Sequence, residues 1–375
     1  MQSCPRCKSI NQHGFFKHQD QWLCRFCLSY ASFIDTKQRS REITLHESDY
    51  GLPFELTPYQ QEVSKQIKNK AMHGSVLVEA VCGAGKTELV IDTIGEALKQ
   101  SKKVGWAIPR RQVVLQLQSR LQKIFKTLEV IAVCEGYTEK WMGDLIVCTT
   151  HQLFRYDRYF DVLILDEPDA FPYKGDRMLE TFANNSVVGN IIYLTATPSQ
   201  EQRKLVNEGS LQHVTLYRRP FDNPLPVPIK KVSFRMHLIF WLYCYLKQTD
   251  KQVMVFVPTI RLAQRLGRLF NISNITSKTE DKENLIERFI TKNEQHIICT
   301  TVLERGVTFS DVQVVVLFAN HRVFDKASLI QISGRVGRDK NHPFGDCYFL
   351  MDETSKEVDQ CIQETKRANA SAFGV

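Results

Sequence analysis

Residues 76–90 read Val76-Leu-Val-Glu-Ala-Val-Cys-Gly-Ala-Gly-Lys-Thr-Glu-Leu-Val90. The apolar run at the start predicts a buried strand, and the residues from Lys86 onward predict the beginning of a helix. Between them, two glycines allow backbone N–H groups to close around phosphate oxygens, while a lysine and a hydroxyl face the phosphates and Mg²⁺. We expect ATP and Mg²⁺ to be bound by Gly83, Ala84, Gly85, Lys86 and Thr87, with Ala80 where such loops usually have their first glycine.

A second apolar run ends in acidic residues, Val162-Leu-Ile-Leu-Asp166-Glu167-Pro168-Asp169. An ATP site needs such a pair at the end of a strand. Asp166 would hold Mg²⁺, and Glu167 would polarise the attacking water. Pro168 is expected just past the strand, where it would keep Glu167 extended. Together with Lys86 and Thr87, this pair predicts an enzyme that hydrolyses ATP.

Length and charge narrow the class of protein. The 375 residues suit two domains with a small appended module. No apolar run has the roughly 18 to 20 uncharged residues of a membrane span, and the first residues lack a secretory core, so we expect a cytoplasmic protein. The formal net charge is +8, and residues 1–41 carry seven basic and two acidic residues, so a polyanionic partner is expected.

Four of the eleven cysteines form two Cys-x-x-Cys pairs, separated by sixteen residues. This spacing predicts a tetrahedral Zn²⁺ site made of Cys4, Cys7, Cys24 and Cys27. Aromatic residues lie between the basic ones of the same segment. Two interpretations remain open for these rings, because they could stack on bases or could form the core of a very small module.

The rest of the chain alternates short β-branched runs with helix-period segments, which predicts parallel sheets covered by helices on both faces. Four prolines within residues 218–228 predict an extended linker between two such lobes. The expected domains are 1–34 (zinc module), 35–56 (connector), 57–217 (first lobe), 218–228 (linker) and 229–375 (second lobe). The expected strands are 76–79, 104–108, 130–133, 146–149, 162–165, 191–194, 253–257, 297–300, 312–317 and 347–350.

These ordered motifs resemble helicase superfamily two, and the resemblance spans residues 56–338. It implies two tandem RecA-like parallel-sheet lobes, preceded here by the zinc module. Gln60 in Thr57-Pro-Tyr-Gln60 looks like the residue that reads adenine. Thr195-Ala-Thr197 is similar to the motif that links hydrolysis to lobe movement. Two further stretches of this chain are similar to the motifs that the second lobe of such proteins brings to the nucleotide. These stretches are Thr300–Thr308, which includes Gly306, and Gln331–Arg338.

Arg335 and Arg338 are three residues apart, so they are expected on one side of a helical turn. There they would face the γ-phosphate during hydrolysis as arginine fingers. Thr308 departs from the family pattern, in which many relatives have an acidic residue that meets the ribose. Nucleoside preference is therefore left open.

Loops that follow strands are expected to hold nucleic acid. Arg110 and Arg111 follow one expected strand, and Thr149, Thr150 and His151 lie at the end of another. Their guanidinium, hydroxyl and backbone N–H groups suit phosphate oxygens. Val257-Pro-Thr259 has a similar place in the second lobe.

The zinc module in front of two compact lobes resembles the ComFA family of competence proteins. Thr149-Thr-His-Gln-Leu153, Asp169-Ala-Phe-Pro-Tyr173 and Leu303-Glu-Arg-Gly-Val-Thr-Phe309 carry this closer likeness, which extends from Cys4 to about residue 365. It implies a DNA-dependent ATPase at the inner face of the cell membrane that helps to draw in single-stranded transforming DNA. The implied partners are a phosphoribosyltransferase-like (ComFC-like) competence protein and the membrane channel for DNA uptake.

Two other functions share the same motifs. An ATP-gated clamp would grip DNA and recruit partners without moving along the strand. A replication-restart helicase would unwind forked DNA, but such proteins usually carry their zinc cysteines within the second lobe, where residues 253–338 hold only Cys299.

Overall fold

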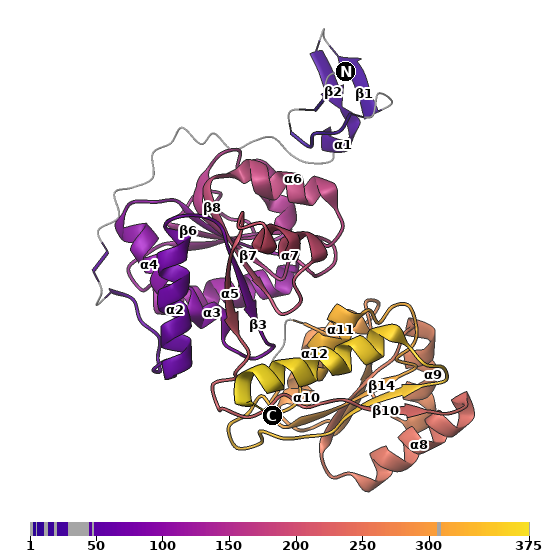
Figure 1. Ribbon diagram of the computed structural model, residues 1–375. Helices are drawn as coiled ribbons and strands as arrows, with labels where there is room; N and C mark the ends of the chain where they lie inside the picture. The colour runs from indigo at the N-terminus through magenta and orange to yellow at the C-terminus, as the bar shows by residue number, and fades with distance from the viewer. Residues whose placement is uncertain are drawn as a thin grey trace. The chain divides into compact units, whose positions relative to one another are not determined.

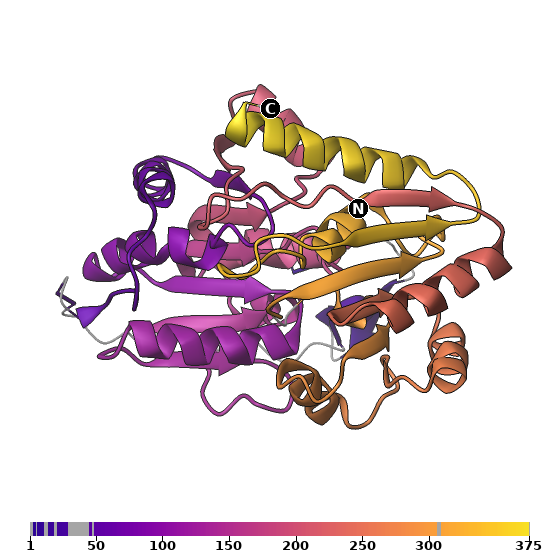
Figure 2. The same ribbon diagram turned by 90° about the horizontal axis from the view of Figure 1, so that it is seen from below.

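A computed structural model describes residues 3–4, 6–10, 14–18, 21–28, 45–46, 49–305 and 309–374. The chain divides into two compact units, of which the first is Met1–Glu79 with Lys86–Leu216 and the second is Ala80–Gly85 with Tyr217–Val375. Gly306, Thr308 and most of the expected connector lie outside the described residues. Figures 1 and 2 show that each unit is built on a β-sheet with helices on both faces.

The sheet of the first unit has seven strands in the order β5-β6-β4-β7-β8-β3-β9. Every described pairing from β5 through to β3 is parallel. All residues of β3, β4 and β6 are buried, as expected for strands covered on both faces. The strands are β3 (Val76–Ala80), β4 (Val104–Ile108), β5 (Val130–Val133), β6 (Leu145–Thr149), β7 (Phe160–Asp166), β8 (Val187–Thr195) and β9 (Gln212–Leu216).

The first helix of this unit begins with a capping box. Thr57 Oγ1 accepts from the Gln60 backbone, and Gln60 Oε1 accepts from the Thr57 backbone, so two backbone donors at the helix start are satisfied. The helices are α2 (Pro58–Ala71), α3 (Lys86–Leu89), α4 (Ile91–Lys99), α5 (Arg111–Ile124), the 3₁₀ helix η3 (Thr150–Arg155), α6 (Arg177–Ser186) and α7 (Gln200–Asn207).

The sheet of the second unit has six strands in the order β10-β15-β14-β11-β13-β12, all paired in parallel. Alternate residues of β11 enter opposite cores: Met254 and Phe256 pack with α10, α11 and α12, whereas Val253 and Val255 pack with α8 and α9. Its strands are β10 (Ile229–Val232), β11 (Gln252–Phe256), β12 (Asn274–Ile275), β13 (His296–Cys299), β14 (Val312–Leu317) and β15 (Cys347–Met351).

Helices cover both faces of this second sheet, with α12 on one side and α8 on the other (Figure 2). They are α8 (Arg235–Gln248), α9 (Ile260–Phe270), α10 (Lys282–Ile290), the 3₁₀ helix η4 (Thr301–Leu303), α11 (Lys326–Ser333) and α12 (Lys356–Phe373). Within the part of the chain that the structure describes, none of the helices combines the length and apolar character that crossing a bilayer requires.

The N-terminal module is an antiparallel hairpin followed by one short helix, namely β1 (Phe15–His18), β2 (Gln21–Cys24) and α1 (Arg25–Leu28) (Figure 1). Asn185 Nδ2 at the end of α6 donates to the Arg6 carbonyl at 2.7 Å, and the Arg6 guanidinium lies 4.7 Å from the ring centroid of Phe154. Two parallel-sheet lobes and a four-cysteine module were predicted from the sequence, and both are confirmed.

Candidate nucleotide and nucleic-acid sites

The phosphate-loop sequence forms the strand, turn and helix that its residues predict. β3 leads into residues 81–85, and α3 begins at Lys86. Gly83 and Gly85 have φ angles of 83° and 85°, a left-handed region that side chains other than glycine rarely adopt. The loop therefore needs both glycines for its backbone path, and Ala84 N donates to the Val81 carbonyl within it at 3.1 Å.

The acidic pair lies at the carboxyl end of β7, where the strand turns sharply. Asp166 is the last residue of β7, and Glu167 donates its backbone N–H to the Leu194 carbonyl at 2.9 Å. Glu167 has φ 54°, so the expectation that Pro168 keeps it extended is wrong. The turn is closed by Ala170 N donating to Glu167 O at 2.9 Å, and this bond requires the chain to double back immediately after the strand.

Negative charge gathers around Asp166. Burial raises the pKa of Asp166 to about 7, with Glu167 adding repulsion, whereas Lys86 and Trp106 lower the pKa. The electrostatic interaction with Lys86 indicates that the lysine and the carboxyl face the same site. A carboxylate and the Thr87 hydroxyl are oxygen ligands of the kind that Mg²⁺ takes alongside water and phosphates, so the residues fit this ion.

A hydrogen-bonded network joins the acidic turn to the end of β8. The hydroxyls of Thr195 and Thr197 donate to the two carboxylate oxygens of Asp169, each at 2.7 Å. Thr197 N also donates to Thr195 Oγ1 at 2.9 Å. Both threonines are buried, so the network ties the motif at 195–197 rigidly to the strand end that carries Asp166.

Gln60 is buried at the start of α2 and has a structural role there. Its Oε1 accepts from Thr57 N at 3.0 Å and from Thr57 Oγ1 at 3.2 Å. These bonds hold the amide in one orientation at the helix start. The predicted contact of Gln60 with adenine stays a prediction.

Three of the five predicted nucleic-acid residues line a groove at the carboxyl ends of three neighbouring strands, β5, β6 and β4. Arg111 follows β4, Trp141 belongs to the loop after β5, and Thr149 and His151 follow β6. Arg110 is the N-cap residue of α5. Thr150 is fully buried inside the lobe and does not line the groove.

The sheet order separates this groove from the acidic turn and Lys86. Carboxyl ends of parallel strands share one edge of a sheet, and here β5, β6 and β4 precede β7, β8 and β3 in that row. One half of the edge therefore carries the groove, and the other half carries Lys86, Asp166 and the Thr195–Thr197 network. Ligands of open parallel sheets bind at this edge.

Positive charge in the groove comes from Arg111 and Arg155 and not from His151 at neutral pH, and the acidic Glu135 lines the same groove. Burial lowers the pKa of His151 below its usual 6.5, although Asp176 and Glu135 act in the opposite direction. Arg111 Nη1 donates to the Glu135 carbonyl at 3.4 Å, and the Arg155 guanidinium lies 4.2 Å from the ring centroid of Trp141. Sequence reasoning missed Arg155 and Trp141, since neither belongs to a motif.

The two arginines that were predicted to be arginine fingers, Arg335 and Arg338, follow the end of α11 and do not lie within a helix. Arg335 is only 2% exposed and lies 5.6 Å from the ring centroid of Phe309. Arg338 is half-buried, and its Nε donates to the Gly334 carbonyl at 2.7 Å. Thr259 caps α9 by accepting from Leu262 N. The assignment of the arginines as fingers stays a prediction.

A third arginine of this unit holds the turn that carries the other two. Arg219 is only 4% exposed, and its guanidinium donates to the carbonyls of Gly334, Val336 and Gly337 at 2.7 to 3.0 Å. Its Nε also donates to the carbonyl of Cys82, which belongs to the same unit, at 3.0 Å. Burial, followed by repulsion from Arg338, lowers the pKa of Arg219 to about 10, so it remains charged at pH 7. Sequence reasoning missed this residue because it lies in the predicted linker.

The four N-terminal cysteines form a site of the size that Zn²⁺ requires. Their sulfur atoms all lie within 4.8 Å of one another, and the Cys4–Cys27 and Cys7–Cys24 distances are both 3.7 Å. A tetrahedron with Zn–S bonds of about 2.3 Å has sulfur atoms about 3.8 Å apart, so the geometry fits the metal. Burial raises the pKa of Cys7 to about 11 and also raises that of Cys27, whereas hydrogen bonds from the backbone of Cys7 and Arg6 lower the pKa of Cys4 despite its burial.

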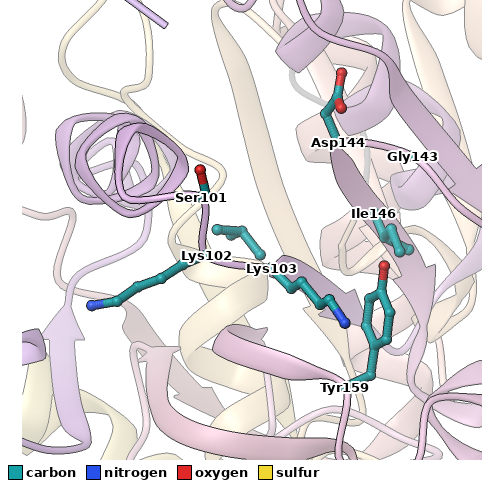
Figure 3. Close-up of a pocket in the computed structure, with 8 residues that line it drawn as sticks. Ser101, Lys102, Lys103, Gly143, Asp144, Ile146 and Tyr159 are labelled. Atoms are coloured by element: carbon teal, nitrogen blue, oxygen red, sulfur yellow. The ribbon is translucent and has the colours of Figure 1, made fainter. Parts of the chain in front are cut away.

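Figure 3 shows a small pocket at the amino ends of β4, β6 and β7. The Lys103 side chain points toward Tyr159, and its ammonium lies 4.4 Å from the ring centroid, whereas Lys102 points away. Lys103 N donates to Asp161 Oδ2 at 2.8 Å. This is the sheet edge opposite to the phosphate loop and the groove, so the pocket belongs to neither site.

Comparison with known protein families and solved structures identifies the class of protein to which this chain belongs. The family described as helicase conserved C-terminal domain matches residues 234–340, and the family described as type III restriction enzyme, res subunit, matches residues 53–200. Among solved structures, yeast Dbp5 bound to RNA and ADP BeF3 is similar over 84% of this chain and 91% of its own, at TM-score 0.61 and 16% identity. Mycobacterium smegmatis helicase Lhr is similar over 84% of this chain and 50% of its own, at TM-score 0.60 and 14% identity. The protein is a helicase-type ATPase of superfamily two, with two RecA-like lobes.

Curated relatives narrow the class further. Competence protein ComFA of Streptococcus pneumoniae is 34% identical, over 98% of this chain and 90% of its own length. Competence protein ComFA of Bacillus subtilis is 33% identical, over 95% of this chain and 83% of its own length. The chain belongs to the ComFA family.

Proposed function

We propose that the protein is a motor that moves along single-stranded DNA by hydrolysing ATP and thereby assists the uptake of transforming DNA. The observation that carries the proposal is the divided sheet edge, with Lys86 and Asp166 on one half and the groove of Arg111 and Arg155 on the other. Membership of the ComFA family supports the setting in competence.

Within this mechanism, each part of the nucleotide site has one task. Gly83, Ala84, Gly85 and Lys86 bind the phosphates, and Thr87 and Asp166 hold Mg²⁺, which neutralises charge on the phosphates when bound. Glu167 orients water for attack on the γ-phosphate. Gln60 reads adenine, Gly306 assists nucleotide binding, and Arg335 and Arg338 stabilise charge on the γ-phosphate during hydrolysis.

The nucleic acid is held by Arg110, Arg111, Thr149 and His151. Thr150, which was predicted with them, is left out of the proposal because its side chain is buried inside the lobe. Arg111 and His151 line the groove, which supports their place in the proposal. Zn²⁺ on Cys4, Cys7, Cys24 and Cys27 completes the module. We further propose that the protein works at the inner face of the membrane with a phosphoribosyltransferase-like partner and the uptake channel.

ATPase measurements with single-stranded DNA, duplex DNA and RNA test the proposal. We expect single-stranded DNA to stimulate turnover most, and Lys86→Ala to abolish turnover while leaving binding of DNA without nucleotide intact. Lys102→Ala, at the other sheet edge, is the matched lysine control. The proposal would be contradicted if ATP turnover were the same without nucleic acid as with single-stranded DNA, duplex DNA or RNA.

A clamp that grips DNA without moving shares every residue described above, so movement needs its own test. Displacement of streptavidin from a biotinylated end of single-stranded DNA distinguishes the two functions. A motor displaces streptavidin from one end in an ATP-dependent manner, and Glu167→Gln stops it. Stimulated ATPase without displacement from either end would identify a clamp.

A further inference from the structure

The loop between β5 and β6, residues 134–144, brings an aromatic side chain into the groove that the proposed motor mechanism does not use. Trp141 lines the groove and is 37% exposed, although indole is a large apolar group that usually packs inside. Tyr137 of the same loop is 51% exposed. A ring left accessible beside arginines is suited to a ligand that has both aromatic faces and negative charge.

Contacts on several sides hold the Trp141 ring and its backbone in place. The Arg155 guanidinium lies 4.2 Å from the ring centroid, and Arg155 Nε donates to Gln152 Oε1 at 2.6 Å, which orients the guanidinium. The buried Tyr156 hydroxyl donates to the Trp141 carbonyl at 2.8 Å. A pre-positioned ring loses little conformational entropy when a ligand stacks on it.

The start of the same loop is fixed as well. Thr138 Oγ1 accepts from Cys134 N at 3.0 Å and donates to Cys134 O at 2.9 Å. The Arg111 guanidinium lies 5.3 Å from the Tyr137 ring centroid and donates to Glu135 O. The loop therefore meets two cationic side chains from different strand ends, Arg155 at the Trp141 ring and Arg111 at the Tyr137 ring, and both arginines line the groove together with Trp141.

This combination favours an unpaired nucleic-acid strand over a duplex. A duplex exposes phosphates but hides its base faces, so it would use the arginines and leave the indole without a partner. An unpaired strand offers both, because its bases can turn out and stack on aromatic rings while its phosphates meet guanidinium groups.

We propose that Trp141 is a base-stacking subsite in the groove, with Arg111 and Arg155 beside it on the phosphates of the same strand. The inference rests on the proposed function and adds to it a physical basis for preferring single strands. Arg155 is a positioning residue for the indole as well as a cation, because a guanidinium stacked on a ring donates from its edge.

The test measures the affinity of the full-length protein for an oligothymidylate and for an abasic oligonucleotide of the same length. Trp141→Ala should weaken binding of oligothymidylate about 5- to 150-fold, the range expected for losing one stacked base. It should leave binding of the abasic strand unchanged. Trp141→Phe should retain most of the affinity, and it guards against loss of folding in the alanine variant.

Two further readouts separate stacking from a structural role. Oligothymidylate should quench the fluorescence of the wild-type protein, and Trp141→Phe should remove most of that quenching while the other three tryptophans remain. Arg155→Lys keeps the charge but not the planar group, and it should weaken binding of the oligothymidylate more than of the abasic strand. Phe240→Ala, which removes a 64% exposed ring from α8, is the matched control and should change nothing.

Equal affinity of wild type and Trp141→Ala for oligothymidylate would overturn the stacking subsite, and so would an equal loss on both strands. Failure of the motor proposal gives a different result. In that case DNA would not stimulate the ATPase activity of the wild-type protein, regardless of how the Trp141 variants bind DNA. Absence of wild-type binding to any single strand would overturn both.

Discussion

At the scale of single residues, the groove uses fixed charge from arginine and a neutral histidine. Because the pKa of His151 lies below 6.5, this side chain carries almost no charge at pH 7.5. Its imidazole can donate or accept a hydrogen bond there but does not neutralise a phosphate. Arg111, by contrast, presents a planar guanidinium of the kind that pairs with phosphate oxygens.

Salt dependence should therefore distinguish the two residues. At pH 7.5 we expect Arg111→Ala to reduce the slope of log affinity against log salt by about 0.7, the value for one phosphate contact on a single strand. His151→Gln should leave the slope unchanged. A slope change in His151→Gln at this pH would show that the histidine is charged.

The same histidine predicts a pH dependence of stability. A lowered pKa means that the folded protein binds fewer protons than the unfolded chain, so the free energy of unfolding should fall as the pH drops below 6.5. Urea unfolding of wild type and His151→Gln at pH 7 and pH 5 checks this. The variant should lose less stability on acidification, and an equal loss would contradict the expected role.

The structure also predicts how replacing Arg219 should change the ATPase activity and the stability of the protein. Its planar group reaches three carbonyls of the turn at 334–337, and the single ammonium of lysine cannot reproduce that geometry. Arg219→Lys should lower kcat more than it raises KM for ATP, because the turn also carries Arg335 and Arg338. We expect a stability loss of about 1 to 3 kcal/mol.

Arg218→Lys is the matched control, since the Arg218 guanidinium pairs with Asp222, donates to the Ala372 carbonyl and lies 4.9 Å from the ring centroid of Phe373. Steady-state kinetics and thermal melting of both variants check the prediction. A change in stability alone, with kcat and KM unchanged, would make Arg219 a purely structural residue.

At the scale of elements, the hairpin β1–β2 and helix α1 have little core apart from the cysteine cluster. Trp22 and Phe26 are exposed, so these two rings do not fill the interior of the module. Modules this small usually need a metal or disulfides to fold. Zinc is therefore expected to hold the hairpin against α1.

Cys24→Ser should reduce bound zinc from about one ion per chain to none, because three thiolates and a hydroxyl make a much weaker site. Elemental analysis of the purified protein measures this directly. Cys244→Ser, which changes a half-buried cysteine of α8, should leave the zinc content at wild-type level. Full zinc occupancy in Cys24→Ser would contradict a Cys4 site.

At the scale of the whole molecule, the two units have separate sheets and cores, so heating should produce two unfolding transitions. ADP at about 100 times its Kd stabilises the unit that binds it by about 2.7 kcal/mol. Because Lys86, Thr87 and Asp166 belong to the first unit, we expect ADP to raise the transition of that unit by about 5 to 11 °C. A non-hydrolysable ATP analogue should raise both transitions if Arg335 and Arg338 act on the γ-phosphate.

Calorimetry of wild type and Arg338→Ala checks this prediction. The variant should respond to the ATP analogue as the wild type responds to ADP, with one transition raised. Two transitions raised equally in Arg338→Ala would remove that arginine from the proposed γ-phosphate site.

Much of the fold was predictable from short-range patterns. Buried parallel strands are near-continuous apolar runs, and all ten expected strands are present, with ends shifted by a few residues at most. The edge strands β9 and β10 and the two-residue β12 were not predicted, because their residues are too few or too polar to stand out. The prediction for Glu167 was wrong because a local rule about proline was outweighed by the hydrogen bond that Glu167 N donates to the Leu194 carbonyl of β8.

The sequence by itself determined the features that depend on neighbours along the chain: the glycine-rich loop at Gly83–Thr87, the acidic pair after β7 and the cluster of four N-terminal cysteines. Only the tertiary structure decided which distant residues meet, such as Asp169 with Thr195, Arg155 with Trp141, and Arg219 with the turn at 334–337. The physical reason is that strand order, which no local pattern specifies, sets these contacts. The glycine-rich loop thus lies at one half of a sheet edge whose other half carries the groove lined by Arg111 and Arg155.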